Sequence, residues 1–157
     1  MIKSKNEIQR EIIDKLKEKN IKGIMLASVR SGKTRQILTG IKEHSLKENP
    51  IIFLAYPNLD VKNSWLDECK KIDYHPDIIF STFMSLEKNK EEKADYYIFD
   101  EAHLLAPDTQ LIIAGEIAKN NKHVIFASGT YSNNTLADIK LYSEMDLIVN
   151  YTTEQAI

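Results

Sequence analysis

The segment Ser31-Gly32-Lys33-Thr34 constrains the fold more than any other part of the chain, because it closely follows a short apolar run at residues 24–27. A strand that leads into Gly-Lys-Thr and then into a helix is the arrangement of a phosphate-binding loop. Gly32 would let backbone N–H groups approach phosphate oxygens, Lys33 would reach the terminal phosphates, and Thr34 would offer a hydroxyl to Mg²⁺. The N-terminus of the following helix would favour the same anion.

The loop departs from the usual pattern at its first glycine, which is replaced by Ala27, five residues before Gly32. This segment alone also allows a competing interpretation: it could be an ordinary strand, turn and helix in which Gly-Lys-Thr occurs by chance. Arg30 could touch phosphate, but solvation is its expected state. The residues expected to line a nucleotide here are Ala27, Ser28, Val29, Arg30, Ser31, Gly32, Lys33 and Thr34.

Length and charge exclude several classes of protein. The chain has 157 residues, which suits one domain with a sizeable core. Its net charge of -2 gives no broad basic field for nucleic acid, so such a partner would need a local patch. The single cysteine, Cys69, allows no internal disulfide, and we expect a reduced, cytoplasmic setting. No signal peptide or membrane-spanning run is visible, so no membrane partner is expected.

Apolar runs of strand length alternate with segments of helical spacing along the chain. This alternation predicts an α/β fold with a mostly parallel sheet and helices on both faces, in which ligands bind at the carboxyl ends of the strands. The expected strands are residues 24–27, 51–56, 77–81, 96–100, 123–128 and 147–151. The expected helices are residues 5–19, 34–46, one capped by Asp60 that runs to Ile72, 108–119 and 136–142.

Three motifs occur in order, each directly after an expected strand: the phosphate loop, Asp100-Glu-Ala-His103 and Ser128-Gly-Thr130. Through these three motifs, the chain resembles the first RecA-like domain of superfamily-two helicases and translocases, the DEAD/DEAH group. That group commonly has alanine as the first loop residue. The resemblance is closer to restriction-enzyme and chromatin-remodeller translocases than to RNA helicases. It implies a RecA-like phosphate-loop fold and an ATPase that uses ATP and Mg²⁺.

The resemblance also implies roles for individual residues. Asp100 and Thr34 would hold Mg²⁺, and Glu101 would orient or deprotonate the attacking water, with Lys33 on the phosphates. Gln9 stands where the family has an adenine-reading glutamine. The residues that would couple the nucleotide to motion are His103, Ser128 and Thr130. The alternatives are a solvated strand end for Asp100 and Glu101, a capping or core histidine for His103, and an ordinary turn for Ser128 and Thr130. For Gln9 the alternative is a glutamine on a polar helix face.

Nucleic-acid contacts are expected near the ends of two other strands. Pro57 and Asn58 resemble the segment that follows a DNA backbone in the family, although the arginine often found there is missing. Thr82 begins a pattern that the family uses for phosphate contact. Trp65 could stack on a base, but its helical spacing with Leu66 and Cys69 favours packing. DNA, single- or double-stranded, is the expected partner rather than RNA.

The family works with two RecA-like domains, and the second supplies arginines that complete the ATP site. We therefore expect residues 1–151 to form the ATP-binding domain, residues 152–157 to begin a linker, and a second domain in cis or in trans to be required. The expected function is the ATP-binding motor half of a DNA helicase or translocase, weakly active alone. The alternative is a solitary nucleotide-binding or protein-interaction module without unwinding activity.

Overall fold

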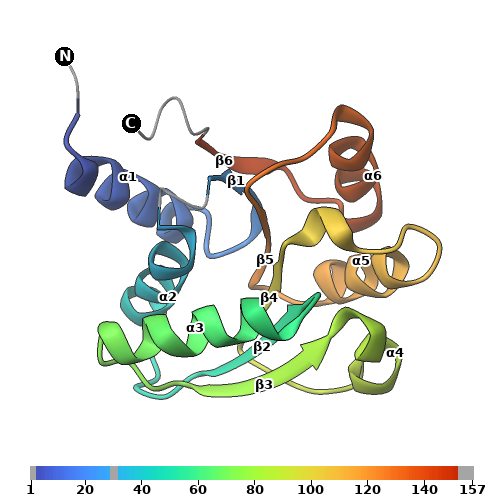
Figure 1. Cartoon of the computed structure of the whole chain (residues 1–157), viewed down its shortest axis with the longest axis horizontal. Coiled ribbons are helices and arrows are strands. Elements are labelled where there is room, and N and C mark those ends of the chain that lie inside the picture. The colour runs from blue at the N-terminus through green and yellow to red at the C-terminus, as the bar shows by residue number, and fades with distance from the viewer. Residues whose placement is uncertain (1–2, 29–31, 152–157) are drawn as a thin grey trace.

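A parallel six-stranded sheet in the order β3-β2-β4-β5-β1-β6 forms the centre of the computed structural model, which describes residues 3–28 and 32–151 (Figure 1). Neighbouring strands run parallel at every pairing. The inner strands are buried along almost their whole length, which explains their continuous apolar sequences. The strands are β1 (Gly23–Ala27), β2 (Ile51–Tyr56), β3 (Asp77–Thr82), β4 (Tyr96–Asp100), β5 (Val124–Ser128) and β6 (Leu147–Tyr151).

The first three helices cover one face of the sheet. They are α1 (Lys5–Glu18), α2 (Lys33–His44) and α3 (Leu59–Lys71). Helix α1 begins as its sequence predicts, because the Ser4 side chain accepts a hydrogen bond from the Glu7 backbone N–H. Leu16, Ile37 and Trp65, one from each helix, are fully buried in the same core cluster as Ile52 and Ile98 of the sheet.

The remaining helices cover the opposite face, so the predicted α/β architecture with helices on both faces is confirmed (Figure 1). Their buried residues, such as Leu86, Leu111 and Ile139, pack with Phe53 and Phe126 of the sheet. The helices are α4 (Leu86–Asn89), α5 (Gln110–Asn120) and α6 (Asn133–Ser143), with the 3₁₀ turns η2 (Phe83–Ser85) and η3 (Ala102–Leu104). No helix of the described ranges is both long and apolar enough to cross a membrane.

Several helix ends differ from the sequence prediction. Asn58 rather than Asp60 caps α3, because its side-chain oxygen accepts from the Val61 N–H at 3.2 Å. The prediction of Asp60 as the cap was therefore wrong. Helix α6 starts at Asn133 rather than at residue 136, because Ser132 caps it through the Thr135 N–H.

The strand order decides which loops meet. Strands β4, β5 and β1 are neighbours, with Phe99 opposite Phe126 and Leu26 opposite Ser128. Their carboxyl ends lie side by side, and each of the three predicted motifs follows one of these strands. The sheet therefore brings together segments that are separated by up to about a hundred residues.

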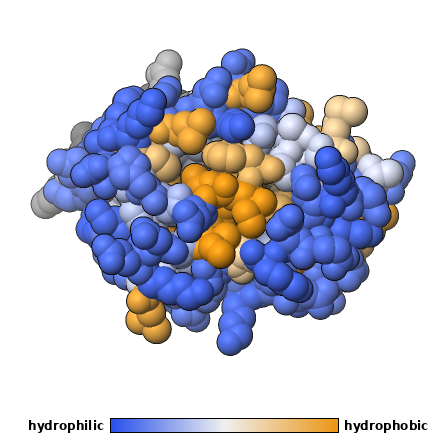
Figure 2. Space-filling view, turned by 90° about the horizontal axis from the view of Figure 1, so that it is seen from below, coloured by the Kyte–Doolittle hydropathy of each residue, from blue (hydrophilic) through white to orange (hydrophobic). Residues whose placement is uncertain are grey.

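One edge of the sheet is formed by β3, which pairs with β2 alone. Its residues Ile78, Ile79 and Phe80 are only half-buried. Figure 2 shows hydrophobic side chains gathered in the middle of the face seen from below, the side of the molecule on which β3 lies in Figure 1, within a largely hydrophilic surround. The candidate site lies elsewhere, at the carboxyl ends of the central strands.

Candidate nucleotide-binding site

The phosphate-loop lysine lies between two carboxylates. Lys33 is the first residue of α2, and its Nζ lies 2.7 Å from Asp100 Oδ1 and 2.7 Å from Glu101 Oε1. Lys33 is 5% exposed and Asp100 3% exposed, so this ion pair is almost excluded from water. Burial alone would lower the pKa of Lys33, but the charges and hydrogen bonds of Asp100 and Glu101 outweigh it and raise that pKa. The ammonium therefore stays charged at neutral pH.

Asp100 ends β4 with both carboxylate oxygens engaged. Oδ1 accepts hydrogen bonds from Lys33 Nζ and from the Glu101 backbone N–H at 2.9 Å. Oδ2 accepts from the indole Nε1–H of Trp65 at 2.8 Å, in a fully buried contact. These bonds fix the carboxylate in one orientation.

Glu101 has left-handed backbone angles, φ 55° and ψ 44°. A non-glycine residue pays on the order of 1 kcal/mol or more for this conformation, and such residues cluster at functional sites. The turn ends β4 sharply and directs the Glu101 carboxylate, which remains partly exposed at 25%, towards Lys33. A partly exposed carboxylate beside a buried one is suited to contact water while the other holds a cation.

The phosphate loop itself is only partly described, since Val29, Arg30 and Ser31 lie outside the described residues. Ala27 ends β1 and Ser28 is buried, with its N–H donating to the Tyr151 carbonyl at 3.1 Å. Gly32 has φ 81° and ψ 39°, a left-handed conformation that glycine adopts without strain. Thr34 follows Lys33 in the first turn of α2 and is half-exposed.

The Gln9 side chain approaches the loop, as the sequence interpretation requires. A Cβ atom built on Gly32 would lie 2.9 Å from Gln9 Nε2. Helix α1 thus brings an amide next to the glycine, and a larger residue at position 32 would collide with it. A base-reading role for Gln9 stays a prediction.

His103 and Ser128 join the turn after β4 to the end of β5. Ser128 Oγ lies 2.5 Å from His103 Nδ1 and donates to the Thr130 carbonyl at 2.6 Å, while the Thr130 N–H donates back to Oγ at 3.1 Å. With the hydroxyl proton directed at Thr130, His103 is the donor from Nδ1. His103 Nδ1 also lies 3.7 Å from Glu101 Oε2. The second and third motifs are therefore in direct contact.

Two further residues belong to this site, although sequence reasoning did not place them there. Trp65 is fully buried and bound to Asp100, which confirms packing rather than base stacking. Burial and the charges of Asp100 and Glu101 raise the pKa of Tyr131 well above its usual range, and its hydroxyl donates to the Phe126 carbonyl at 3.2 Å. A buried tryptophan must find an acceptor for its N–H, and this was the available signal for Trp65.

The residues predicted to contact nucleic acid lie apart from this cluster, at the ends of β2 and β3. Asn58 caps α3 and is exposed, and Pro57 precedes it. Thr82 caps η2, since its Oγ1 accepts from the Ser85 N–H at 3.1 Å and donates to Ser85 Oγ. These local bonds explain the residue types, and contact with nucleic acid stays a prediction.

A cavity of about 240 Å³ adjoins the phosphate loop between the start of α2 and α3. Arg35 crosses its wall and binds Glu68 at 3.0 Å. The lining residues are Gly32, Lys33, Thr34, Arg35, Ser64, Asp67, Glu68 and Lys71. The space next to Lys33 is therefore open to a ligand.

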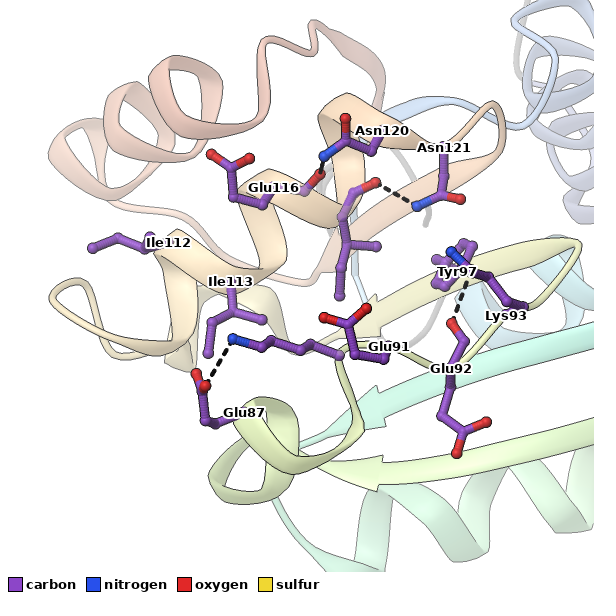
Figure 3. A pocket seen from close by; sticks show the side chains of 12 residues that line it. Glu87, Glu91, Glu92, Lys93, Tyr97, Ile112, Ile113, Glu116, Asn120 and Asn121 are labelled. Atoms are coloured by element: carbon purple, nitrogen blue, oxygen red, sulfur yellow. Dashed lines mark hydrogen bonds and ion pairs between the residues drawn. The ribbon is translucent and has the colours of Figure 1, made fainter.

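A separate pocket of about 580 Å³ between α4 and α5 contains none of the predicted site residues (Figure 3). Glu87 and Lys90 pair across 2.7 Å on its rim, and Ile113 and Tyr97 line its interior. Its charges are mixed and it offers no phosphate loop, so it is not the nucleotide site.

The residues of the cluster fit a hydrated divalent cation. In the described ranges, no group of three or more His, Cys, Asp or Glu side chains could enclose a metal ion. Mg²⁺ in phosphate-transfer sites takes only one or two protein oxygens and completes its shell with phosphates and waters. The Lys33 ammonium already occupies the position of a cation between Asp100 and Glu101. If that ammonium moved to a phosphate, the Asp100 carboxylate would be available to Mg²⁺ and the Glu101 carboxylate to water.

Comparison with known proteins supports this fold. The chain matches the UvsW helicase of bacteriophage T4 with a TM-score of 0.71 and 12% identity over 89% of its own length. It matches the Pyrococcus furiosus Hef helicase domain with a TM-score of 0.69 and 14% identity over 92%. It matches the Sulfolobus solfataricus SWI2/SNF2 ATPase core, solved in complex with double-stranded DNA, with a TM-score of 0.61 and 22% identity over 81%.

The chain therefore shares its fold with these helicase and ATPase domains, and the predicted fold class, a RecA-like α/β domain with a parallel sheet, is confirmed. The chain spans 58%, 37% and 32% of the lengths of these structures, respectively. No family model matches the sequence. No curated protein matches it either.

Proposed function

We propose that this chain is the ATP-binding half of a nucleic-acid-dependent motor, which hydrolyses Mg-ATP to drive movement on DNA. The observation that carries the proposal is the Lys33 ammonium, held between Asp100 and Glu101 at the N-terminus of α2. Lys33 follows β1, and the two carboxylates lie at the end of β4, with only β5 between these strands, so all three lie at the strand ends where parallel sheets bind ligands. The fold shared with helicase and translocase structures agrees with this function.

The residues would act as follows. Lys33 would leave the carboxylates and bind the terminal phosphates, while the first N–H groups of α2 face the same anion. Thr34 and Asp100 would hold Mg²⁺, which when bound neutralises charge on the phosphates. Glu101 would orient the attacking water and accept its proton. Gln9, close to Gly32, would read the adenine edge.

Part of the positive charge that stabilises the transition state is expected from another domain. Both arginines of the described ranges are occupied by carboxylates, Arg10 by Asp14 and Glu43, and Arg35 by Glu68. Neither reaches across a site formed at the end of β4. We propose that a second RecA-like domain, in cis or in trans, supplies arginine to the γ-phosphate, which contributes about 10³- to 10⁵-fold in related phosphate-transfer enzymes.

DNA is the proposed partner, contacted through Pro57, Asn58 and Thr82. One of the structural neighbours was solved with double-stranded DNA, which supports this choice over RNA. The contacts would come from the carboxyl ends of β2 and β3, apart from the ATP site but at the same end of the parallel strands.

The deciding experiment is calorimetric titration of Mg-ATP into the chain and into Lys33→Ala. The wild type should bind and the variant should lose binding, because the only buried cation of the cluster is gone. Lys42→Ala, a change in the last turn of the same helix, is the control and should bind as the wild type does. Unchanged affinity in Lys33→Ala would rule out the phosphate-loop assignment.

A further inference from the structure

Trp65 connects helix α3 to the metal-binding candidate Asp100. Its side chain is 0% exposed, and its Nε1–H donates to Asp100 Oδ2 at 2.8 Å. The indole ring could be buried for packing alone, but its buried N–H also requires a hydrogen-bond acceptor. Here the acceptor is a charged carboxylate. Phenylalanine would fill most of the same volume without this bond.

The two oxygens of Asp100 have different partners. Oδ1 accepts from Lys33 and the Glu101 N–H, whereas Oδ2 accepts from Trp65 alone among the residues that the structure describes. When Lys33 moves to a phosphate, Oδ1 loses its cation. Oδ2 keeps the indole, because Trp65 is enclosed in the core cluster with Ile98 and Leu54.

We infer that Trp65 is a positioning residue of the ATP site, which holds Asp100 Oδ2 so that Oδ1 is directed at the Mg²⁺ ion. This inference rests on the proposed function, since it assigns to Asp100 the role of a metal ligand. Hydrogen bonds from such outer partners fix a ligating carboxylate, and their loss typically lowers metal affinity about 10- to 100-fold. The role differs from packing because it acts through one polar atom.

If Trp65 only packs, its replacement should leave the Mg²⁺ dependence of ATP binding unchanged, whereas a positioning role predicts a higher Mg²⁺ requirement. Trp65→Phe removes the N–H and leaves an aromatic ring. Phe53→Leu is the matched control, because Phe53 is also buried, at 1% exposure, but belongs to the core on the opposite face of the sheet. Both variants lose packing, and only Trp65→Phe loses the bond to Asp100.

The experiment measures the affinity for ATP at a series of Mg²⁺ concentrations and in EDTA, by calorimetry, in the wild type and both variants. Trp65→Phe should require about 10-fold or more Mg²⁺ for half-maximal enhancement of ATP binding, with its affinity in EDTA unchanged. Phe53→Leu should keep the wild-type Mg²⁺ requirement. Equal requirements in the two variants would overturn the positioning role while the proposed function stands.

A second measurement, tryptophan fluorescence, uses the wild-type protein and so does not depend on whether a variant folds. Trp65 is the only tryptophan of the chain, so intrinsic indole fluorescence reports on it alone. Mg-ATP should change its emission, and ATP in EDTA should change it less, because the metal ion alters the charge that faces the indole. Identical spectra in the two conditions, with binding shown by calorimetry, would contradict the inference. If the wild type binds no Mg-ATP, the proposed function fails and this inference fails with it.

Discussion

The hydroxyl of Ser128 lies 2.5 Å from Nδ1 of His103, a residue 25 positions earlier in the chain, and this contact joins the end of β5 to the turn after β4. Ser128 is fully buried at the end of β5, while His103 lies in the turn that follows Glu101. The contact places an imidazole between the end of β5 and the carboxylate proposed to activate water.

We expect this contact to stabilise the fold as a pair. Ser128→Ala and His103→Ala should each destabilise the protein, and the double variant should lose less than their sum, with a coupling of roughly 0.5 to 1.5 kcal/mol. Urea unfolding of the four proteins gives the value. Additive effects would show that the two side chains do not interact in solution.

Glu101→Gln tests the proposal that Glu101 activates water while Asp100 holds Mg²⁺. The amide keeps the shape but attracts the Lys33 ammonium less, so ATP should bind as tightly as in the wild type or more tightly. Single-turnover hydrolysis should fall by roughly 10²- to 10⁴-fold, the usual contribution of a general base. Hydrolysis at the wild-type rate would remove Glu101 from the reaction.

Acid should weaken the contact between α1 and α2. Hydrogen bonds from Arg10, partly opposed by burial and aided by Lys17, lower the pKa of Glu43 to about 2. A folded-state pKa below the unfolded value gives stability that is present above about pH 4.5 and lost as the pH falls towards 2. The pair is partly solvated, so this amounts to less than about 1 kcal/mol.

Urea unfolding at pH 7, 4 and 3 checks this expectation with Glu43→Gln. The variant should be slightly less stable at pH 7 and should lose less stability than the wild type on acidification. Glu18→Gln, whose carboxylate is largely exposed and 4.0 Å from Lys15, is the control. A parallel decline of Glu43→Gln and the wild type would refute the assignment.

Alanine substitution at two helical glycines should have opposite effects on the free energy of unfolding. A Cβ on Gly115 of α5 would lie 2.6 Å from the backbone oxygen of Tyr142 in α6, so Gly115→Ala forces the two helices apart. We expect a loss of about 1–3 kcal/mol. A Cβ on Gly40 of α2 would meet only side-chain atoms at 3.6 Å and beyond, so Gly40→Ala should gain up to about 1 kcal/mol from helix propensity. Thermal unfolding of both variants decides whether α5 and α6 pack this closely.

The fold was predictable because buried parallel strands leave an unmistakable pattern. Runs such as residues 51–56 and 96–100 are apolar on both faces, and the polar motifs that follow them belong to strand ends. The meeting of Lys33 with Asp100 and Glu101 follows from the rule that ligands bind at those ends. The order of the strands does not follow from the sequence, because pairing depends on contacts between distant segments.

The part of the site that escaped prediction depends on side-chain direction. Helical spacing showed that Trp65 would be buried, but not that its N–H would point at Asp100. The cap of α3 was misplaced because Asn58 and Asp60 are both good caps, and only the path of the chain after β2 selects between them. The close approach of Gly115 to Tyr142 could not be predicted from the sequence, because helix packing depends on the tertiary arrangement.

Asn58 caps helix α3 where the chain leaves β2, and the helix carries Trp65 on its inner side two turns later. Seven residues of α-helix span roughly 10 Å, and a helix of this length bends little. Two turns of one helix and a single hydrogen bond therefore connect the cap at Asn58, a predicted nucleic-acid contact, to the carboxylate of Asp100.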